Sequence, residues 1–194
     1  MKKILQKDAP VLRKVAEEVP LESIGSKELN KVLDEMKEAL ESQDDGVAIA
    51  APQIGYALRI FVVSRRVETI MSEEKKIAFA NSETEEVNEE EDVDEGEDLV
   101  FINPVIKKIS KERRFVDEGC LSVRYLYGKV SRATKVKIEA YDENGKKFER
   151  GGTGLMAQIF QHETDHLDGI LFIDKAKDLE DLPPEKNKIK KDEK

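Results

Sequence analysis

Residues 162–166 read His-Glu-Thr-Asp-His, and this element constrains the fold more than any other part of the chain. Two side chains four positions apart lie one above the other on an α-helix, so this spacing lets two imidazoles bind one metal ion if the segment is helical. Apolar and histidine side chains also recur at i, i+4, i+7 and i+11, as Leu155, Ile159, His162 and His166. We expect a helix that Thr153 caps, with both histidines on its core-facing side.

A metal site of this kind needs a third protein ligand and one open position. Leu167 to Ile170 offer no further histidine, and the sequence contains only two. The single cysteine, Cys120, is the remaining soft ligand, and Gly119 before it suits a bulge or close approach that would direct a thiolate inward. The alternatives are that Cys120 is a small buried hydrophobic residue and that the histidines are ordinary core or surface residues.

The composition fits one globular domain in the cytoplasm. A chain of 194 residues can bury one substantial core. With one cysteine no internal disulfide can form, as expected in a reducing compartment. No apolar run approaches the ~20 residues of a membrane span, and the first residues lack the apolar segment of a signal peptide. We expect neither a membrane nor DNA as a partner.

The formal charge of −9 comes mainly from one acidic segment of the chain. Residues 83–98 contain eleven acidic side chains and no basic one, and subtracting those charges leaves +2 for the rest. The net charge therefore does not exclude RNA as a partner. The same composition predicts a mobile acidic insertion at about 64–98, as a solvated loop or as a docking or regulatory element.

Apolar patterning predicts a helix and several strands before the histidine helix. Residues 26–42 would be helical with Ser26 as the N-cap, and Asp142 to Gly145 would form a hairpin turn. The expected strands are 58–63, 99–103, 111–117, 128–132, 136–141 and 146–150. We expect an α+β fold, with antiparallel β-sheets packed around the central C-terminal helix that carries the H-E-x-x-H element, and with an N-terminal helix. The domain would span 1–175, followed by a polar, Lys-rich tail at 176–194.

Three segments resemble the signature motifs of the peptide deformylases, in the order of that family. They are Gly46 to Gln53, Glu118 to Ser122 and Gln161 to Leu167, and the resemblance extends from Lys3 to about Asp174. It implies removal of the formyl group from N-formylmethionyl nascent polypeptides, with release of formate. It also implies one divalent metal ion held by Cys120, His162 and His166, usually Fe²⁺ in the cell, with Zn²⁺, Ni²⁺ or Co²⁺ as alternatives.

The resemblance further assigns a role to each remaining site residue. Glu163 would be the general acid/base, while Gln53 and the Leu121 backbone N–H would bind the formyl oxygen. These roles make chemical sense, because amide and backbone donors can stabilise the negative charge that grows on that oxygen. The substrate would lie against Gly46, Val47, Ala48, Leu155, Gln158 and Ile159.

Several residues around the motifs call for separate expectations. Glu118 would pair with Arg132 or accept a hydrogen bond from a ligand imidazole, unless it forms an ordinary surface ion pair. Gln161 and Asp165 would orient the helix. The chain departs from the family at Ala48, where glycine is usual, and at Arg124, where proline is usual, and Tyr125-Leu126-Tyr127 is unusual there. These departures concern the shape of the substrate pocket.

Two other functions stay open from sequence alone. A zinc peptidase could use the same helix with a different third ligand, and a relative that binds formylated chain ends without catalysis could keep the motifs. Ribosome contact is a separate hypothesis, because lysines in the tail could touch RNA phosphates. These lysines are at 186, 188, 190, 191 and 194.

Overall fold

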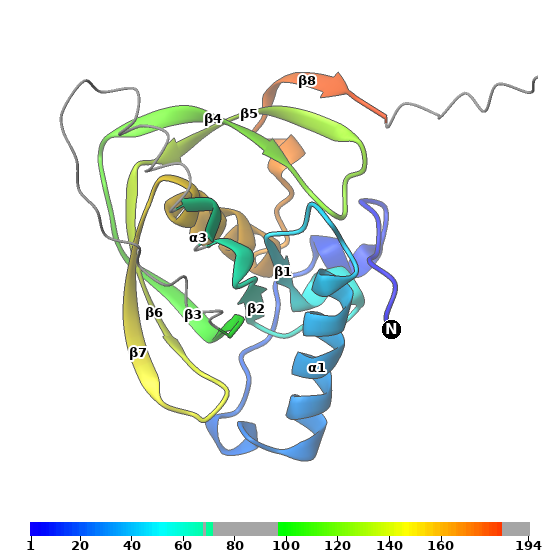
Figure 1. The fold of residues 1–194 in the computed structure, drawn as a ribbon, viewed down its shortest axis with the longest axis vertical. Coiled ribbons are helices and arrows are strands. Elements are labelled where there is room, and N and C mark those ends of the chain that lie inside the picture. The colour runs from blue at the N-terminus through cyan, green and yellow to red at the C-terminus, as the bar shows by residue number, and fades with distance from the viewer. Residues whose placement is uncertain (68, 72–96, 184–194) are drawn as a thin grey trace, which may run out of the picture.

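Two antiparallel β-sheets and the helix between them define the architecture of the computed structural model, which describes residues 1–67, 69–71 and 97–183. Helix α3 (Gly154–Leu167) lies inside the curve of the sheets, and α1 (Lys27–Glu41) packs outside (Figure 1). The expected α+β fold with a central C-terminal helix is therefore confirmed. In the described part of the chain, no helix is long and apolar enough to cross a membrane.

The larger sheet has five strands in the order β1-β2-β3-β6-β7, all antiparallel. Strand β1 lies at one end, so it pairs with β2 on one side only. The tip of the β6–β7 hairpin contains Gly145 with φ +76°, which explains why glycine follows asparagine in the predicted turn. The strands are β1 (Ala48–Ala50), β2 (Ile60–Val63), β3 (Leu99–Ile109), β6 (Lys135–Tyr141) and β7 (Lys147–Thr153).

The smaller sheet has the order β4-β5-β8 and covers the other side of α3 (Figure 1). Its strands are β4 (Arg113–Gly119), β5 (Leu126–Ala133) and β8 (Lys177–Asp181). The sequence predicts a polar tail at residues 177–181, because the chain after Phe172 is mostly polar, and in the structure every side chain of β8 is exposed. They form a strand because backbone hydrogen bonding to β5 does not require apolar side chains.

Helix α1 follows the prediction closely. The Ser26 side chain accepts a hydrogen bond from the Leu29 N–H, and the apolar residues at helical spacing are buried: Leu29, Val32, Leu33, Met36 and Leu40. Thr153 occupies the N-cap position of α3 but its side chain makes no capping hydrogen bond, so that prediction is wrong. The described residues also contain four 3₁₀ helices: η1 (Pro10–Arg13), η2 (Leu21–Ser23), η3 (Ala51–Ile54) and η4 (Phe172–Asp174).

Aromatic rings join α3 to the larger sheet. Phe61 on β2 and Phe101 on β3 stack with centroids 4.5 Å apart, and Phe160 on α3 meets Phe101 edge-on at 5.3 Å. All three are fully buried. This packing fixes the position of α3 relative to the larger sheet and its rotation about its own axis. It therefore also fixes the direction in which the opposite face of the helix points.

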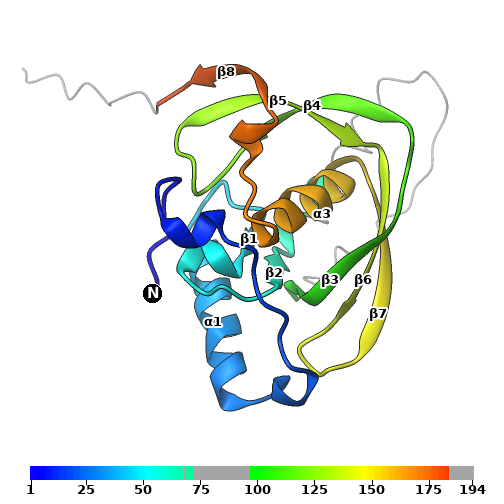
Figure 2. The ribbon, with the colours of Figure 1, turned by 180° about the vertical axis from the view of Figure 1, so that it is seen from behind.

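The N-terminal segment closes the end of α3, as the reverse view shows (Figure 2). The Ala16 N–H donates to the Leu167 carbonyl at 2.8 Å, which satisfies one of the free carbonyls at the end of that helix. Glu17 then exchanges backbone hydrogen bonds with Ala57 and Arg59. Residues far apart in sequence thereby hold α3 from both sides.

The predicted acidic insertion falls mainly on residues 72–96, which lie outside the described residues, as do residues 184–194 of the predicted tail. The first part of the predicted insertion belongs to the folded body. Val67 is fully buried in the core, and Ser64 is buried as well. The insertion therefore begins later than residue 64.

The close contact between β7 and α3 predicts the effect of one added methyl group. A Cβ at Gly152 would lie 2.9 Å from the Phe160 ring and 3.1 Å from the Ala157 backbone nitrogen. We expect Gly152→Ala to lower the free energy of unfolding by about 1–3 kcal/mol in urea denaturation. Gly151→Ala is the matched control, because its Cβ meets nothing within 4 Å. It should stay within about 1 kcal/mol of the parent, and equal losses in both variants would contradict this packing.

Candidate metal centre and pocket

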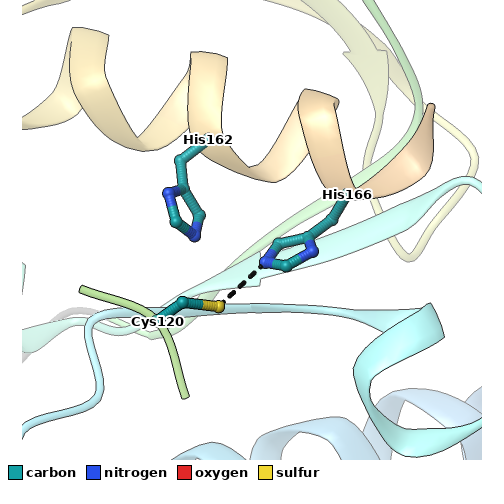
Figure 3. A group of neighbouring side chains, drawn as sticks. All are labelled: Cys120, His162 and His166. Carbon is teal, nitrogen blue, oxygen red and sulfur yellow. Dashed lines mark hydrogen bonds between the residues drawn. The ribbon is translucent and has the colours of Figure 1, made fainter. Parts of the chain in front are cut away.

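Three potential metal ligands converge from two elements. Cys120 directly follows β4, whereas His162 and His166 project from successive turns of α3 toward it (Figure 3). One ligand atom from each residue lies within 4.8 Å of the others. Cys120 Sγ lies 3.2 Å from His166 Nε2. The structure thus brings together the three residues that the sequence singled out as ligands.

Gly119 allows Cys120 to take this position. A Cβ at Gly119 would lie only 2.6 Å from the ring of Tyr127, its neighbour across the β4–β5 pair. Glycine lets the aromatic ring cover the backbone immediately before the thiol. The close approach expected at Gly119 is therefore present.

The donor set fits a divalent transition metal ion. One thiolate and two imidazoles suit zinc, iron(II), nickel or cobalt, and three protein ligands leave a position open. Burial lowers the pKa of His166, and neighbouring His162 lowers it further. Burial also opposes a charge on His162, but hydrogen bonds to Cys120 and Glu118 outweigh it and raise the pKa of that imidazole. Since a metal ion binds neutral imidazole, protonation would compete with the ion.

A buried ion pair orients one of these imidazoles. Glu118 accepts hydrogen bonds from Arg132 Nε at 2.6 Å and Nη2 at 2.9 Å, and its Oε2 accepts another from His162 Nδ1 at 3.1 Å. The structure therefore confirms both predicted contacts of Glu118, the one with Arg132 and the one with the imidazole of His162. The alternative of a surface ion pair is wrong, because Glu118 and Arg132 are 3% and 4% exposed.

The same arginine links this pair to α3. Arg132 Nη1 donates to Asp165 at 2.7 Å, and Asp165 also accepts from Lys175 at 2.6 Å. Gln161 anchors α3 to β5 by accepting from the Ala133 N–H and donating to its carbonyl. Gln161 and Asp165 thus hold the helix at a fixed distance from the smaller sheet.

Burial and hydrogen bonding shift the two glutamates near the metal ligands in opposite directions. Burial would raise the pKa of Glu118, but hydrogen bonds from Arg132 and His162 outweigh it and lower the pKa from 4.5 to about 2. Burial raises the pKa of Glu163 to about 7. Glu163 Oε2 is buried and has no hydrogen-bond partner among the described residues. Glu163 can therefore take up and release a proton near neutral pH.

Gln53 presents its amide N–H group to the thiol. Its Oε1 accepts from the Ala50 N–H at 2.7 Å, so the amide orientation is fixed. Nε2 then donates to Ser122 Oγ at 3.1 Å and contacts Cys120 Sγ at 3.6 Å. The side chain is 1% exposed, which makes it a rigid donor beside the candidate ligands.

Hydrogen bonds hold the two peptide units on either side of Leu121. The Val123 N–H donates to the Cys120 carbonyl at 3.0 Å, and Gln6 Nε2 donates to the Leu121 carbonyl at 3.0 Å. The Leu121 N–H shares its peptide unit with the Cys120 carbonyl, so the first contact sets its direction. A fixed backbone donor next to a metal ligand suits an oxyanion site.

A pocket of about 300 Å³ opens beside the ligands, which is within the range of small-ligand sites. Gln53, Cys120, Leu121, His162 and Glu163 line its inner end. All six residues expected to contact a substrate line it too: Gly46, Val47, Ala48, Leu155, Gln158 and Ile159. Ala48 does not have a positive φ, so alanine is unstrained where the family usually has glycine.

Sequence reasoning missed several residues of this site. Gln6 contacts the loop after Cys120 from more than a hundred residues away, and Ser122 accepts from Gln53. Asp45 lines the pocket and pairs with Arg124. Gln6 carries no motif, and Ser122 belongs to the second motif but had no predicted contact. Arg124 was visible as a departure from the family, but the sequence does not identify its partner.

Comparison with known proteins identifies similar chains over most of this length. Residues 1–181 match the family described as Polypeptide deformylase. Peptide deformylase 2 of Clostridium acetobutylicum is 35% identical over 175 residues, which cover 90% of this chain and 94% of that protein. Peptide deformylase 1A, chloroplastic/mitochondrial, of Arabidopsis thaliana is 39% identical over 86% of this chain. The match spans 58% of the Arabidopsis protein and 59% of the Solanum lycopersicum peptide deformylase 1A.

Solved structures agree with this similarity. A class I type b peptide deformylase from Acinetobacter baumannii has a TM-score of 0.72 at 29% identity, covering 90% of this chain and 98% of that one. The peptide deformylase from Thermotoga maritima has a TM-score of 0.70 at 30% identity, covering 91% and 98%. The arrangement of sheets around α3 is thus shared with these proteins.

The buried network predicts that removing one partner is costly. Arg132→Met would leave the Glu118 carboxylate buried without its main compensation, and we expect the free energy of unfolding to fall by about 3–5 kcal/mol. Urea denaturation of metal-free protein at neutral pH measures this. Because the pKa of Glu118 is lowered in the folded parent, its contribution is present above about pH 4.5 and is lost as the pH falls toward 2. The difference between the two proteins should therefore narrow in acid.

The matched control is Arg114→Ala, whose exposed pair with Glu112 should contribute less than about 1 kcal/mol. A second variant, Glu118→Gln with Arg132→Met, removes both charges and should recover part of the loss. Equal stabilities for Arg132→Met and Arg114→Ala would contradict a structural role of the buried pair.

Proposed function

Because the chain belongs to the peptide deformylase family, we propose that it hydrolyses the N-terminal formyl group of formyl-methionyl nascent polypeptides and releases formate. One observation carries this proposal. Cys120, His162 and His166 converge, and Cys120 and His162 line a pocket together with Glu163 and Gln53. A hydrolase of the formamide bond needs this combination of metal ligands, proton carrier and oxyanion donor.

The pocket suits an extended peptide with an apolar first side chain. Among the described strands, β1 pairs only with β2, so its other edge is available to a peptide that adds as a further strand. Gly46, Val47 and Ala48 would lie along the substrate backbone. Leu155, Gln158 and Ile159 on α3 would surround the methionine side chain, because they line the same pocket.

The metal ion would be held by Cys120, His162 and His166. A divalent cation in this site supplies Lewis-acid chemistry and lowers the pKa of water toward ~7. We propose Fe²⁺ as the ion used in the cell, with Zn²⁺, Ni²⁺ or Co²⁺ able to take its place, since a mixed thiolate and imidazole set accepts all of them. The Glu118 carboxylate would keep Nδ1 of His162 protonated, so that Nε2 faces the ion.

Glu163 would move the protons of the reaction. Its pKa of about 7 in the buried site matches a group that first accepts a proton from water and then delivers it to the leaving amine. Its unpartnered Oε2 supports the same role, because that atom is held ready without a competing hydrogen bond.

Gln53 and the Leu121 N–H would stabilise the negative charge that grows on the formyl oxygen. Both donors are fixed before substrate arrives, Gln53 through the Ala50 N–H and the Leu121 N–H through the hydrogen bond to the Cys120 carbonyl of its peptide unit. Preorganised donors of this kind contribute roughly 3 kcal/mol each to a transition state.

The other readings of the sequence have less support. A zinc peptidase with the H-E-x-x-H helix would need its own third ligand, whereas Cys120 already lies within 4.8 Å of both histidine ligand atoms. A relative that binds formylated chain ends without catalysis would not need a buried glutamate with a pKa near neutrality.

Formate release from formyl-Met-Ala-Ser tests the proposal. With anaerobically purified protein loaded with Fe²⁺ or Ni²⁺, Glu163→Ala should reduce kcat by about 100- to 10,000-fold and keep its metal. Cys120→Ala should lose both turnover and stoichiometric metal, because two imidazoles alone bind weakly. Glu28→Ala changes an exposed carboxylate on α1 and should match the parent.

A parent protein that binds one metal ion per chain but releases no formate would contradict the deformylase activity. In that case cleavage of unformylated peptides would favour the peptidase, and binding of formyl peptides without turnover would favour the binding protein. Metal retained at full stoichiometry in Cys120→Ala would contradict the proposed ligand set.

Ribosome contact through the Lys-rich tail is also proposed, in keeping with action on nascent chains in the cytoplasm. Deleting residues 184–194 removes the five tail lysines and leaves β8 intact. Co-sedimentation with ribosomes should fall, and its salt dependence should become shallower, because fewer RNA phosphates are neutralised. Formate release should be unchanged. Undiminished co-sedimentation of the shortened chain would remove this hypothesis.

A further inference from the structure

Arg124 joins two loops at the mouth of the pocket. Its Nη1 donates to Asp45 Oδ2 at 2.5 Å, and its Nη2 donates to Asp45 Oδ1 at 3.0 Å and to Gln43 Oε1 at 2.9 Å. The planar guanidinium thus makes a two-pronged contact with the carboxylate, which restricts direction as well as distance. Asp45 and Arg124 both line the pocket.

The contact between Arg124 and Asp45 holds the residue that precedes the proposed substrate edge. Asp45 is the residue immediately before Gly46, and Gly46, Val47 and Ala48 lead into β1. The other side of the same loop is held by Arg66, whose Nη atoms donate to the carbonyls of Gln43 and Asp44, each at 3.2 Å. Two guanidinium groups therefore hold the loop, Arg66 from one side and Arg124 from the opposite wall of the pocket.

The opposite wall is itself fixed. The Arg124 backbone N–H donates to Gln6 Oε1 at 3.3 Å, while Gln6 Nε2 donates to the Leu121 carbonyl. Arg124 therefore connects the proposed substrate edge to the segment that carries Cys120 and Leu121. It fixes the position of one relative to the other. The hydrogen bonds from Arg124 lower the pKa of Asp45, so the carboxylate stays charged at neutral pH.

We propose that Arg124 is a positioning residue that, through Asp45, fixes the Gly46–Ala48 edge against which the peptide beyond the formyl-methionine lies. This inference rests on the proposed function. Arg124 does not reach the metal ligands or Glu163 in any contact among the described residues, so it should affect substrate affinity more than the chemical step.

The test compares KM and kcat for formyl-Met and formyl-Met-Ala-Ser. Arg124→Ala should raise KM for the tripeptide by about three- to tenfold and change kcat by less than about twofold. The increase should be smaller for formyl-Met, which lacks the residues that would follow the edge. Arg124→Lys keeps the charge but not the two-pronged geometry, and its KM should fall between those of the parent and Arg124→Ala.

A double-mutant cycle separates the pair from two independent effects. Asp45→Asn should raise KM as Arg124→Ala does, and adding both changes should raise it little further, because each removes the same contact. Arg114→Ala is the matched control, since it removes an exposed arginine from another ion pair outside the pocket lining and should leave KM unchanged. Thermal unfolding of every variant checks that the chain remains folded.

The results distinguish the role of Arg124 from the deformylase activity on which it rests. Turnover by the parent with an unchanged KM in Arg124→Ala, equal effects on both substrates, or multiplicative effects in the double variant would each overturn the role of Arg124 and leave the deformylase activity in place. Absence of turnover in the parent would overturn the proposed function, and this inference with it.

Discussion

The buried carboxylate of Glu118 is the point on which the arrangement of sheets, helix and ligands depends. It belongs to β4, its main partner Arg132 belongs to β5, and His162 and Asp165 connect both to α3. A charge removed from water is stable only when nearby groups of opposite charge or hydrogen-bond donors compensate it. If these elements moved apart, the Glu118 carboxylate would lose its partners or become exposed to solvent. The geometry of the candidate metal ligands is therefore tied to the electrostatics of Glu118, Arg132 and Asp165, which are not among them.

The aromatic core supplies the complementary constraint from the other side of α3. Phe61, Phe101 and Phe160 set the helix against the larger sheet by packing, whereas Arg132 and Gln161 set it against the smaller sheet by polar contacts. One face of the helix is thus apolar and the other carries the histidines. A helix enclosed in this way holds its side chains more rigidly than one on the surface.

Residues whose role follows from local spacing could be predicted from sequence. The histidine helix, the single cysteine and the apolar face of α1 all depend on periodicity or on a lone chemical candidate, and they were predicted at the right positions. Contacts that depend on tertiary arrangement could not be predicted. Gln6 meets Leu121 across the molecule, and the partner of Arg124 is set by the path of the loop before Gly46. Strand β8 was not predicted from the sequence, because its pairing with β5 needs no apolar side chain.

Strand β8 also decides where an extended peptide can attach. An unpaired strand edge recruits other extended chains, and β5 runs beside the pocket with its edge covered by Lys177–Asp181. The newly exposed edge of β8 is a poor template, because it is short, largely charged and interrupted by Asp178 with φ +52°. Under the proposed function the substrate is an extended peptide, and each open strand edge offers it a competing place to pair. Because the charged strand β8 covers the edge of β5, the edge of β1 is left for the proposed substrate.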